Sequence, residues 1–186
     1  MKKIPTLFKR NYDGDRLVRD EVVEGCEWVL AGEGVATRKY DGTCCMVKNG
    51  KLYKRREIKR GKTPPPDFVP ETDVDEQTGK IQGWVPVGDG KEDRWHREAF
   101  TDCVWDDGTY ELLGPKIQGN PEALASHTLI SHVGAEQLPR FPRTFDEIRV
   151  VFEAGVPYEG VVWHHPDGRM CKIKVRDFGF RRMTSR

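Results

Sequence analysis

The sequence predicts an α+β domain built mainly from antiparallel sheet, and three turn signals are the main reason. Asp41-Gly42, Asn49-Gly50 and Pro166-Asp167-Gly168 each separate two runs of β-forming residues, which is the short-range pattern of a β-hairpin. Parallel strands would need a crossover of a dozen or more residues instead. Only one long amphipathic helix stands out, at 144–154. Many strands with few helices indicate the α+β class.

The first two turns predict a three-stranded antiparallel meander. Its strands are 35–40 (VATRKY), 43–48 (TCCMVK) and 51–57 (KLYKRRE). Asp and Gly tolerate the positive φ that tight turns need. We therefore expect Asp41-Gly42 to form a hairpin turn between the first two strands. The alternative is that this segment holds Lys39 in place as a nucleophile, and the local pattern alone does not decide between the two.

The middle of the chain is poorer in regular structure. Residues 59–93 are rich in Pro, Gly and Asp and include the stiff segment TPPPDF. A segment this long is rarely a passive connection, so it predicts a loop-rich insertion, of which 83–87 (GWVPV) could pack onto the body. A short helix at 95–100 and a strand at 109–114 are expected after it.

The last third predicts a helix followed by a hairpin. Thr144 suits the N-cap of the helix at 144–154, Glu147 completes a capping box, and the apolar residues share one face. Strands are expected at 159–165 and 169–176, joined by the third turn.

Composition sets the class of protein. The 186 residues fit one domain, and the 37% hydrophobic residues exceed the disordered range. The net charge is +1, but eight basic residues gather at positions 48–62. A neutral average can hide a positive face for a polyanion, although a solvated strand and loop is the alternative reading.

Cysteines and apolar runs indicate the compartment. The five cysteines are an odd number without metal-type spacing, which fits a reducing, cytoplasmic location. No apolar run approaches the length of a membrane span, and the N-terminus lacks the apolar core of a signal peptide. We expect a monomer with no membrane partner.

Four charged residues lie on short, otherwise apolar runs. Glu111 lies in YELLGPK and Glu159 in EGVVW, while KIKV places Lys172 and Lys174 on one face of a strand, with Ile173 on the other. Charges on such strands are costly in a core, where they lose water. They are reasonable if they line a groove that binds a nucleoside polyphosphate.

These segments resemble, in order, the collinear motifs of the covalent nucleotidyltransferase superfamily of ligases and capping enzymes. The matching motifs are KYDG at 39–42, YELLG at 110–114, EGVV at 159–162 and KIKV at 172–175. The resemblance runs from about residue 36 to 178. It implies an ATP-grasp-like nucleotidyltransferase domain of antiparallel sheets with flanking helices, a single domain over 1–186 with the insertion at 59–93. Few residues follow the last motif, so no C-terminal OB domain is expected.

Within that superfamily the sequence around the motifs is similar to that of the small ATP-dependent 5′-3′ RNA ligases. The similar stretches are KYDGTCC, KLYKRREIKRGKTPP, GWVPV, GTYELLGPKIQGNPE and EGVVWHHPDGRMCKIK. The resemblance implies that Lys39 attacks the α-phosphate of ATP, that AMP passes to an RNA 5′-phosphate, and that a 3′-hydroxyl expels AMP. The expected partners are ATP, Mg²⁺ (or Mn²⁺) and RNA with 5′-phosphate and 3′-hydroxyl ends, and RNA repair is the expected setting.

The lysine chemistry explains the charged residues near the nucleophile. An ordinary lysine, with a pKa of about 10.4, is neutral for only about 0.04% of the time at pH 7. Desolvation or neighbouring cations must lower that pKa. Lys172, Lys174 and Mg²⁺ are the candidate cations, and they also neutralise the triphosphate. Glu159 suits the metal or the reactive amine.

The resemblance assigns the nucleotide-binding roles as follows. Glu111 is expected to accept hydrogen bonds from ribose hydroxyls. Arg56 or Arg55 is expected to clamp a phosphate or the ribose, because DNA ligases have an arginine where this chain has Cys44.

Aromatic and turn residues complete the predicted nucleotide site. Adenine stacks on an aromatic side chain in the family, and Tyr110 or Trp163 is the candidate for it. Asp41 and Gly42 shape the segment that follows Lys39.

Other functions stay open at this stage. A DNA ligase or an mRNA guanylyltransferase shares the motifs, but the cysteine at position 44 and the absence of an expected OB domain disfavour both. A catalytically silent RNA-end-binding module and a protein AMP-transferase are further alternatives. An RNA ligase is the leading hypothesis.

Overall fold

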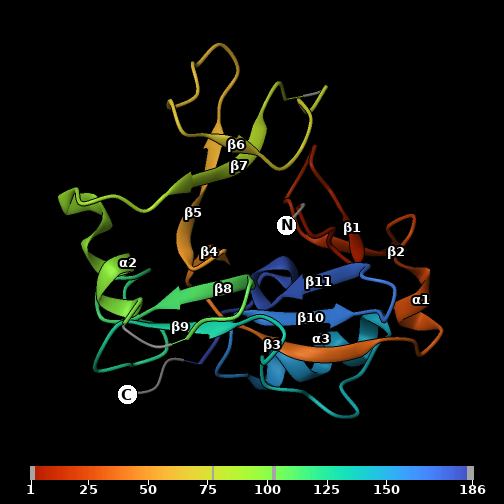
Figure 1. Ribbon diagram of the computed structural model, residues 1–186. Helices are drawn as coiled ribbons and strands as arrows, with labels where there is room; N and C mark the ends of the chain where they lie inside the picture. Colours follow the sequence, from red (N-terminus) through yellow and green to blue (C-terminus); the bar gives the residue numbers. More distant parts are fainter. Residues whose placement is uncertain (1–2, 77, 102–103, 184–186) are drawn as a thin grey trace. The chain divides into compact units, whose positions relative to one another are not determined.

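A computed structural model describes residues 3–76, 78–101 and 104–183. The described residues form two compact units, of which unit 1 lies between Asp41 and Gly134, and unit 2 contains Lys3–Tyr40 and the residues from Ala135 onward. The strand pairs within the sheets are antiparallel and the helices are few and short (Figure 1), which confirms the α+β class. Cys103 lies outside the described residues.

Unit 1 is built on a six-stranded antiparallel sheet in the order β6-β7-β5-β4-β8-β9. Its strands are β4 (Thr43–Lys48), β5 (Lys51–Ile58), β6 (Val69–Pro70), β7 (Ile81–Pro86), β8 (Gly108–Leu113) and β9 (Thr128–Ser131). A 3-10 turn, η1 (Lys91–Asp93), leads into the short helix α2 (Arg94–Ala99). One face of the sheet carries the core, in which Cys45, Leu112 and Leu129 are buried.

Unit 2 has a three-stranded antiparallel sheet with β10 in the middle. Its elements are β1 (Phe8–Arg10), β2 (Val18–Val22), α1 (Glu27–Leu30), β3 (Val35–Lys39), α3 (Phe145–Ala154), β10 (Gly160–His164), β11 (Met170–Lys174) and the 3-10 helix η2 (Val175–Phe178). Strands β1 and β2 form a separate pair. Ile148 and Phe152 of α3 are fully buried in one core with Val161, Trp163 and Ile173 of the sheet.

The two later hairpins are confirmed. Asn49 and Gly50, with φ of 51° and 68°, turn the chain between β4 and β5. Asn and Gly adopt this left-handed backbone readily in a tight turn. Strands β10 and β11 pair in register across the third turn signal, with Val161 opposite Ile173.

The expected hairpin at Asp41-Gly42 is wrong. Strand β3 pairs with β10, whereas β4 pairs with β5 and β8, so the chain leaves one sheet and enters another at this point. Neither residue has a positive φ. Glycine is needed at 42 for a different reason, because a Cβ there would lie 2.2 Å from the Leu112 carbonyl oxygen and 2.6 Å from the Leu113 side chain.

Two further expectations change in detail. The hydroxyl of Thr144 donates to the Glu147 carboxylate at 2.6 Å and not to the helix backbone, so the capping box is wrong, although the helix begins where expected. The 59–93 segment is less irregular than expected, because β6 and β7 extend the sheet from β5. Strands β1, β2 and β9 were not anticipated, since their runs are short, although Asp13-Gly14 between β1 and β2 has the composition of a turn.

Among the helices of the described ranges, none has the length and apolarity that crossing a lipid bilayer requires.

Candidate functional site

Four charged side chains gather at one end of the unit 2 sheet, and we call them the lysine cluster: Lys39, Glu159, Lys172 and Lys174. Strand register explains the arrangement. Gly160 of β10 lies opposite Lys39 of β3 on one side and opposite Lys174 of β11 on the other. Directly opposed residues of antiparallel strands share a face, so the side chains of Lys39 and Lys174 lie on the same face of the sheet.

Glu159 joins the two lysines. Its Oε2 accepts a hydrogen bond from Lys39 Nζ at 2.5 Å, and its Oε1 accepts one from Lys174 Nζ. Lys39 Nζ also donates to the carbonyl oxygen of Tyr40 at 3.2 Å. The side chains of Lys39, Lys174 and Glu159 are only 18%, 15% and 11% exposed. Charge-assisted hydrogen bonds of this kind fix geometry, so the Lys39 amine has a defined position.

Burial and charge set the protonation of the cluster. Burial favours the neutral form of Glu159, but the ammonium groups of Lys39 and Lys174 outweigh it and lower the pKa of Glu159 below its usual range. Burial, together with the positive charges of Lys174 and Lys39, lowers the pKa of Lys172 to about 8. Lys172 is therefore the lysine of the cluster whose loss of a proton near neutral pH has a clear physical cause.

A glycine keeps the face between the two lysines open. A Cβ on Gly160 would lie 2.1 Å from the Ile173 carbonyl oxygen and 2.7 Å from the Lys174 Cα. Real Cβ atoms do not approach backbone this closely, so any side chain at 160 would displace β11. Ile173 itself is fully buried on the opposite face, as the KIKV pattern predicted.

A buried ion pair supports the end of β11. The backbone N–H of Lys174 donates to Asp177 Oδ2 at 2.9 Å, and the guanidinium of Arg10 pairs with the other oxygen of Asp177. Asp177 is almost completely buried. This pair could not be predicted from the sequence, because Arg10 lies 167 positions away from its partner and no local pattern connects them.

Unit 1 has a second polar arrangement, which we call the polar row: Arg55, Cys44, Glu111 and His132. Cys44 of β4 lies opposite Glu111 of β8. Arg55 of β5 and His132, which follows β9, continue the row on either side by strand register. Burial, the largest influence, and the Glu111 carboxylate raise the pKa of the Cys44 thiol to about 11, while the charge of Arg55 opposes the shift. This thiol is therefore a poor nucleophile.

Both oxygens of Glu111 are held. Oε1 accepts the backbone N–H of Gly42 at 3.1 Å, and Oε2 lies 3.0 Å from His132 Nε2. The other ring nitrogen of His132 lies 2.9 Å from the hydroxyl of Thr109. No role was predicted for His132, because its partners are on the neighbouring strand and no spacing along the chain indicates them.

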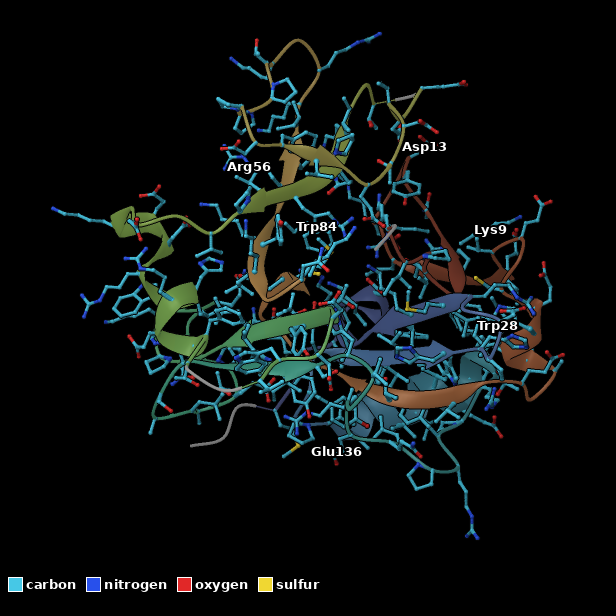
Figure 2. All side chains as sticks on the ribbon, in the orientation of Figure 1. Lys9, Asp13, Trp28, Arg56, Trp84 and Glu136 are labelled. Carbon is cyan, nitrogen blue, oxygen red and sulfur yellow. The ribbon has the colours of Figure 1, made fainter. Side chains whose placement is uncertain are left out.

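The two candidate arginines lie on opposite faces of β5. Arg55 shares the face of Glu111, stacks over the ring of Trp84 at 5.6 Å and donates to Gln82 at 3.3 Å. Arg56 follows it in the strand and is exposed on the other face. Figure 2 labels Arg56 and Trp84 on the neighbouring strands β5 and β7. Of the two, only Arg55 belongs to the polar row.

The two candidate aromatic side chains lie in the cores. Trp163 is fully buried on the core face of β10, and Tyr110 is 6% exposed, with its hydroxyl donating to the carbonyl oxygen of Asp106 at 2.8 Å. Tyr110 lies on the face of β8 opposite to Glu111. Neither ring presents a free face on which a base could stack in this structure.

Two further expectations concern Asp41 and the metal ion. Asp41 is half-buried at the start of unit 1. Within the described ranges, no three His, Cys, Asp or Glu side chains are grouped to hold a metal ion. Both oxygens of Glu159 already accept hydrogen bonds from ammonium groups. The donors present in this arrangement therefore do not fit a protein-ligated Mg²⁺.

Comparison with known proteins gives a distant relationship. No protein-family model matches the chain. The chain is 30% identical to RNA ligase 1 of Mus musculus in an alignment that covers 76% of this chain and 65% of the mouse protein. It is 29% identical to RNA ligase 1 of Rattus norvegicus with the same coverage, and 26% identical to that of Danio rerio. The chain thus spans slightly less than two thirds of the mouse and rat proteins, and it is a distant relative of proteins with this name.

Proposed function

We propose that this protein is an ATP-dependent RNA ligase that joins 5′-phosphate and 3′-hydroxyl ends through a covalent lysyl-AMP intermediate. The observation that carries the proposal is the lysine cluster, in which the Lys39 amine is held 2.5 Å from Glu159 beside two further lysines. The distant relationship to proteins named RNA ligase 1 supports the choice of reaction and of RNA as substrate. The arrangement also suits a nucleotidyltransferase fold.

The first step forms a nitrogen–phosphorus bond. The neutral amine of Lys39 attacks the α-phosphorus of ATP, the bond from that phosphorus to the bridging oxygen breaks, and pyrophosphate leaves. The ammonium loses one proton before the attack, and the amine loses a second as the phosphoramidate forms. Lys174 and Lys172 lie where they can neutralise the charge on the triphosphate and on the leaving pyrophosphate.

The protons need an acceptor. Glu159 is a weak base because its pKa is lowered, so its role is to orient the Lys39 amine. With a pKa of about 8, Lys172 is neutral in about a tenth of the molecules at pH 7. We propose that the protons that Lys39 loses pass to water or to the neutral amine of Lys172.

The next two steps move AMP and seal the ends. An oxygen of the RNA 5′-phosphate attacks the phosphorus of lysyl-AMP, the nitrogen–phosphorus bond breaks and the Lys39 amine takes a proton. The RNA 3′-hydroxyl then attacks the RNA 5′-phosphorus, loses its proton and expels AMP. The positive charge of the lysine cluster stabilises the transition state of each step, because negative charge gathers on phosphate oxygens in all of them.

In unit 1, we propose that Glu111 accepts hydrogen bonds from ribose hydroxyls of the nucleotide and that Arg55, in preference to Arg56, binds a phosphate or the ribose. Arg55 lies on the face of Glu111, which supports this choice. Mg²⁺ would arrive on the phosphates of ATP, which it binds while keeping several waters, and would offset their charge.

The test of the proposal is covalent labelling. Incubation with ATP labelled at the α-phosphate should leave an acid-stable label on the protein, and Lys39→Ala should lose it. Lys9→Ala is the matched control, because Lys9 of the same unit, labelled in Figure 2, is 59% exposed and pairs with Glu21 on the surface. Label that persists in Lys39→Ala would exclude Lys39 as the nucleophile, and an unlabelled parent protein would exclude the ligase.

Substrate choice is tested in the same reaction. Labelling by GTP instead of ATP would indicate a guanylyltransferase. RNA ends and nicked DNA are then offered to the labelled protein. We expect joining of RNA with 5′-phosphate and 3′-hydroxyl ends, and joining of DNA nicks alone would contradict the proposal.

A further inference from the structure

His132 of unit 1 is anchored to β8 at three points. Its backbone N–H donates to the Thr109 carbonyl oxygen at 3.0 Å, its Nδ1 lies 2.9 Å from the Thr109 hydroxyl, and its Nε2 lies 3.0 Å from Glu111 Oε2. A neutral imidazole with its hydrogen on Nε2 satisfies both ring contacts, because it donates to Glu111 and accepts from the hydroxyl of Thr109. The orientation of the ring is therefore set by its neighbours.

The carboxylate of Glu111 is fixed from two sides. His132 holds Oε2, and the backbone N–H of Gly42 donates to Oε1 at 3.1 Å. The terminal torsion of a glutamate is otherwise broad, so these two contacts decide the plane of the carboxylate. Each carboxylate oxygen has about two acceptor positions, so one position on each oxygen is left for a ligand. The side chain is 11% exposed.

We propose that His132 is a positioning residue, which orients Glu111 so that its two oxygens accept hydrogen bonds from the two neighbouring hydroxyls of a ribose. This inference rests on the assignment of Glu111 to the nucleotide under the proposed function. Two parallel acceptors match two cis hydroxyl donors, and a deoxyribose lacks one of them. The consequence is selectivity for ribonucleotides over deoxyribonucleotides. Glu111 contacts the ribose directly, and His132 contributes by orienting Glu111.

Two substitutions separate positioning from general stability. In His132→Gln the side-chain amide reaches the place of Nε2 and can still donate to Glu111. In His132→Asn the amide reaches only the place of Nδ1, so the contact to Thr109 can persist while Glu111 loses its donor. His127→Asn is the control, because His127 is a histidine of the same unit whose Nδ1 contacts another glutamate, Glu98, at 2.7 Å.

The measurement is the dissociation constant of ATP, 2′-deoxy-ATP and 3′-deoxy-ATP, by isothermal titration calorimetry in a Lys39→Ala background that cannot form lysyl-AMP. We expect the deoxy forms to bind about ten-fold or more weakly than ATP, which is the usual range for one hydrogen bond to a charged group. His132→Gln and His127→Asn should keep this ratio of the deoxy-ATP dissociation constant to that of ATP. His132→Asn should bring it close to one, with a melting temperature near that of His132→Gln.

Equal ratios in His132→Gln and His132→Asn, whether both kept or both lost, would overturn the positioning role. The same measurements distinguish a failure of this inference from a failure of the proposed function. A parent protein that forms lysyl-AMP but shows unchanged ratios in His132→Asn overturns the inference alone. Ratios that change as expected in a protein that never forms lysyl-AMP support the inference and overturn the ligase. Absence of ATP binding overturns both.

Discussion

At the scale of single residues, the lysine cluster holds more positive than negative charge. Three ammonium groups gather around one carboxylate, and burial strengthens their repulsion because less water screens it. The lowered pKa of Lys172 results first from the burial of its amine and then from the charges of Lys174 and Lys39. A site with unbalanced positive charge is costly for the free protein and favourable for a polyanionic ligand, which fits the triphosphate of the proposed substrate.

The first prediction concerns Lys172→Met, which should stabilise the nucleotide-free protein near neutral pH. The folded pKa of Lys172, about 8, lies below the ordinary value of 10.5, so the folded protein binds fewer protons between these values and its stability rises with pH across that window. The penalty is fully present below pH 8. Removing the charge should raise the free energy of unfolding by at most about 3 kcal/mol there.

Urea unfolding at pH 7 and at pH 9.5 measures this effect. The advantage of Lys172→Met should shrink at the higher pH, whereas Lys9→Met, at an exposed lysine of the same unit, should be nearly neutral at both. Equal stability of the parent and Lys172→Met at pH 7 would contradict the prediction.

The second prediction concerns Glu159→Gln, which leaves the ammonium groups of Lys39 and Lys174 without their shared carboxylate. Removing one partner of a largely buried ion pair is destabilising, and we expect a loss of about 2–4 kcal/mol in the free energy of unfolding. Lys174→Met in the same chain should recover part of the loss. A double-mutant cycle with purely additive effects would show that Glu159 and Lys174 are not coupled.

At the scale of elements, β10 is the strand that assembles the cluster. It lies between β3 and β11, carries core residues on one face, and begins with Gly160 at the level of Lys39 and Lys174. Its neighbour Glu159 is thereby within reach of both lysines. The absence of a side chain at 160 lets the backbone of β11 approach closely at this level.

The third prediction is that Gly160→Ala disrupts this end of the sheet. The new Cβ would meet the Ile173 carbonyl oxygen at 2.1 Å, which only a shift of β11 can relieve. We expect a loss of about 2 kcal/mol or more in stability, together with loss of lysyl-AMP formation. Gly108→Ala is the control, because the nearest atom to its Cβ is 3.9 Å away. Equal melting temperatures of the two variants would argue against the close approach.

At the scale of the whole molecule, the chain has two separate cores. Phe152 of α3 is fully buried in the core of unit 2, and Leu112 of β8 is fully buried in the core of unit 1. Each unit therefore has its own apolar basis for stability, which is the usual property of a unit that can open by itself.

The fourth prediction follows from these two cores. Phe152→Ala and Leu112→Ala each leave a cavity, and we expect each to cost about 2–5 kcal/mol. Hydrogen exchange should show lost protection first in unit 2 for Phe152→Ala and first in unit 1 for Leu112→Ala. Equal loss of protection in both units for either variant would mean that the chain unfolds as one cooperative body.

The sequence alone was enough to predict the class of the fold and the shared face of Lys172 and Lys174. Alternation along β11 was enough to place Lys172 and Lys174 on one face and Ile173 on the other, because the strand period is two and does not depend on distant contacts. Asn49-Gly50 likewise specified its hairpin, since the φ values that the turn needs are a property of these two residues.

Features that depend on strand pairing could be found only in the folded chain. Asp41-Gly42 has the composition of a hairpin turn, yet β3 and β4 belong to different sheets, and Gly42 is required by the backbone of Leu112. Strand register decides that Arg55, and not Arg56, lies on the same face of the sheet as Glu111. It also decides the contact of His132 with Glu111. Local residues fix local backbone geometry, but long-range pairing is set by the sum of packing over a whole sheet, which no short segment contains.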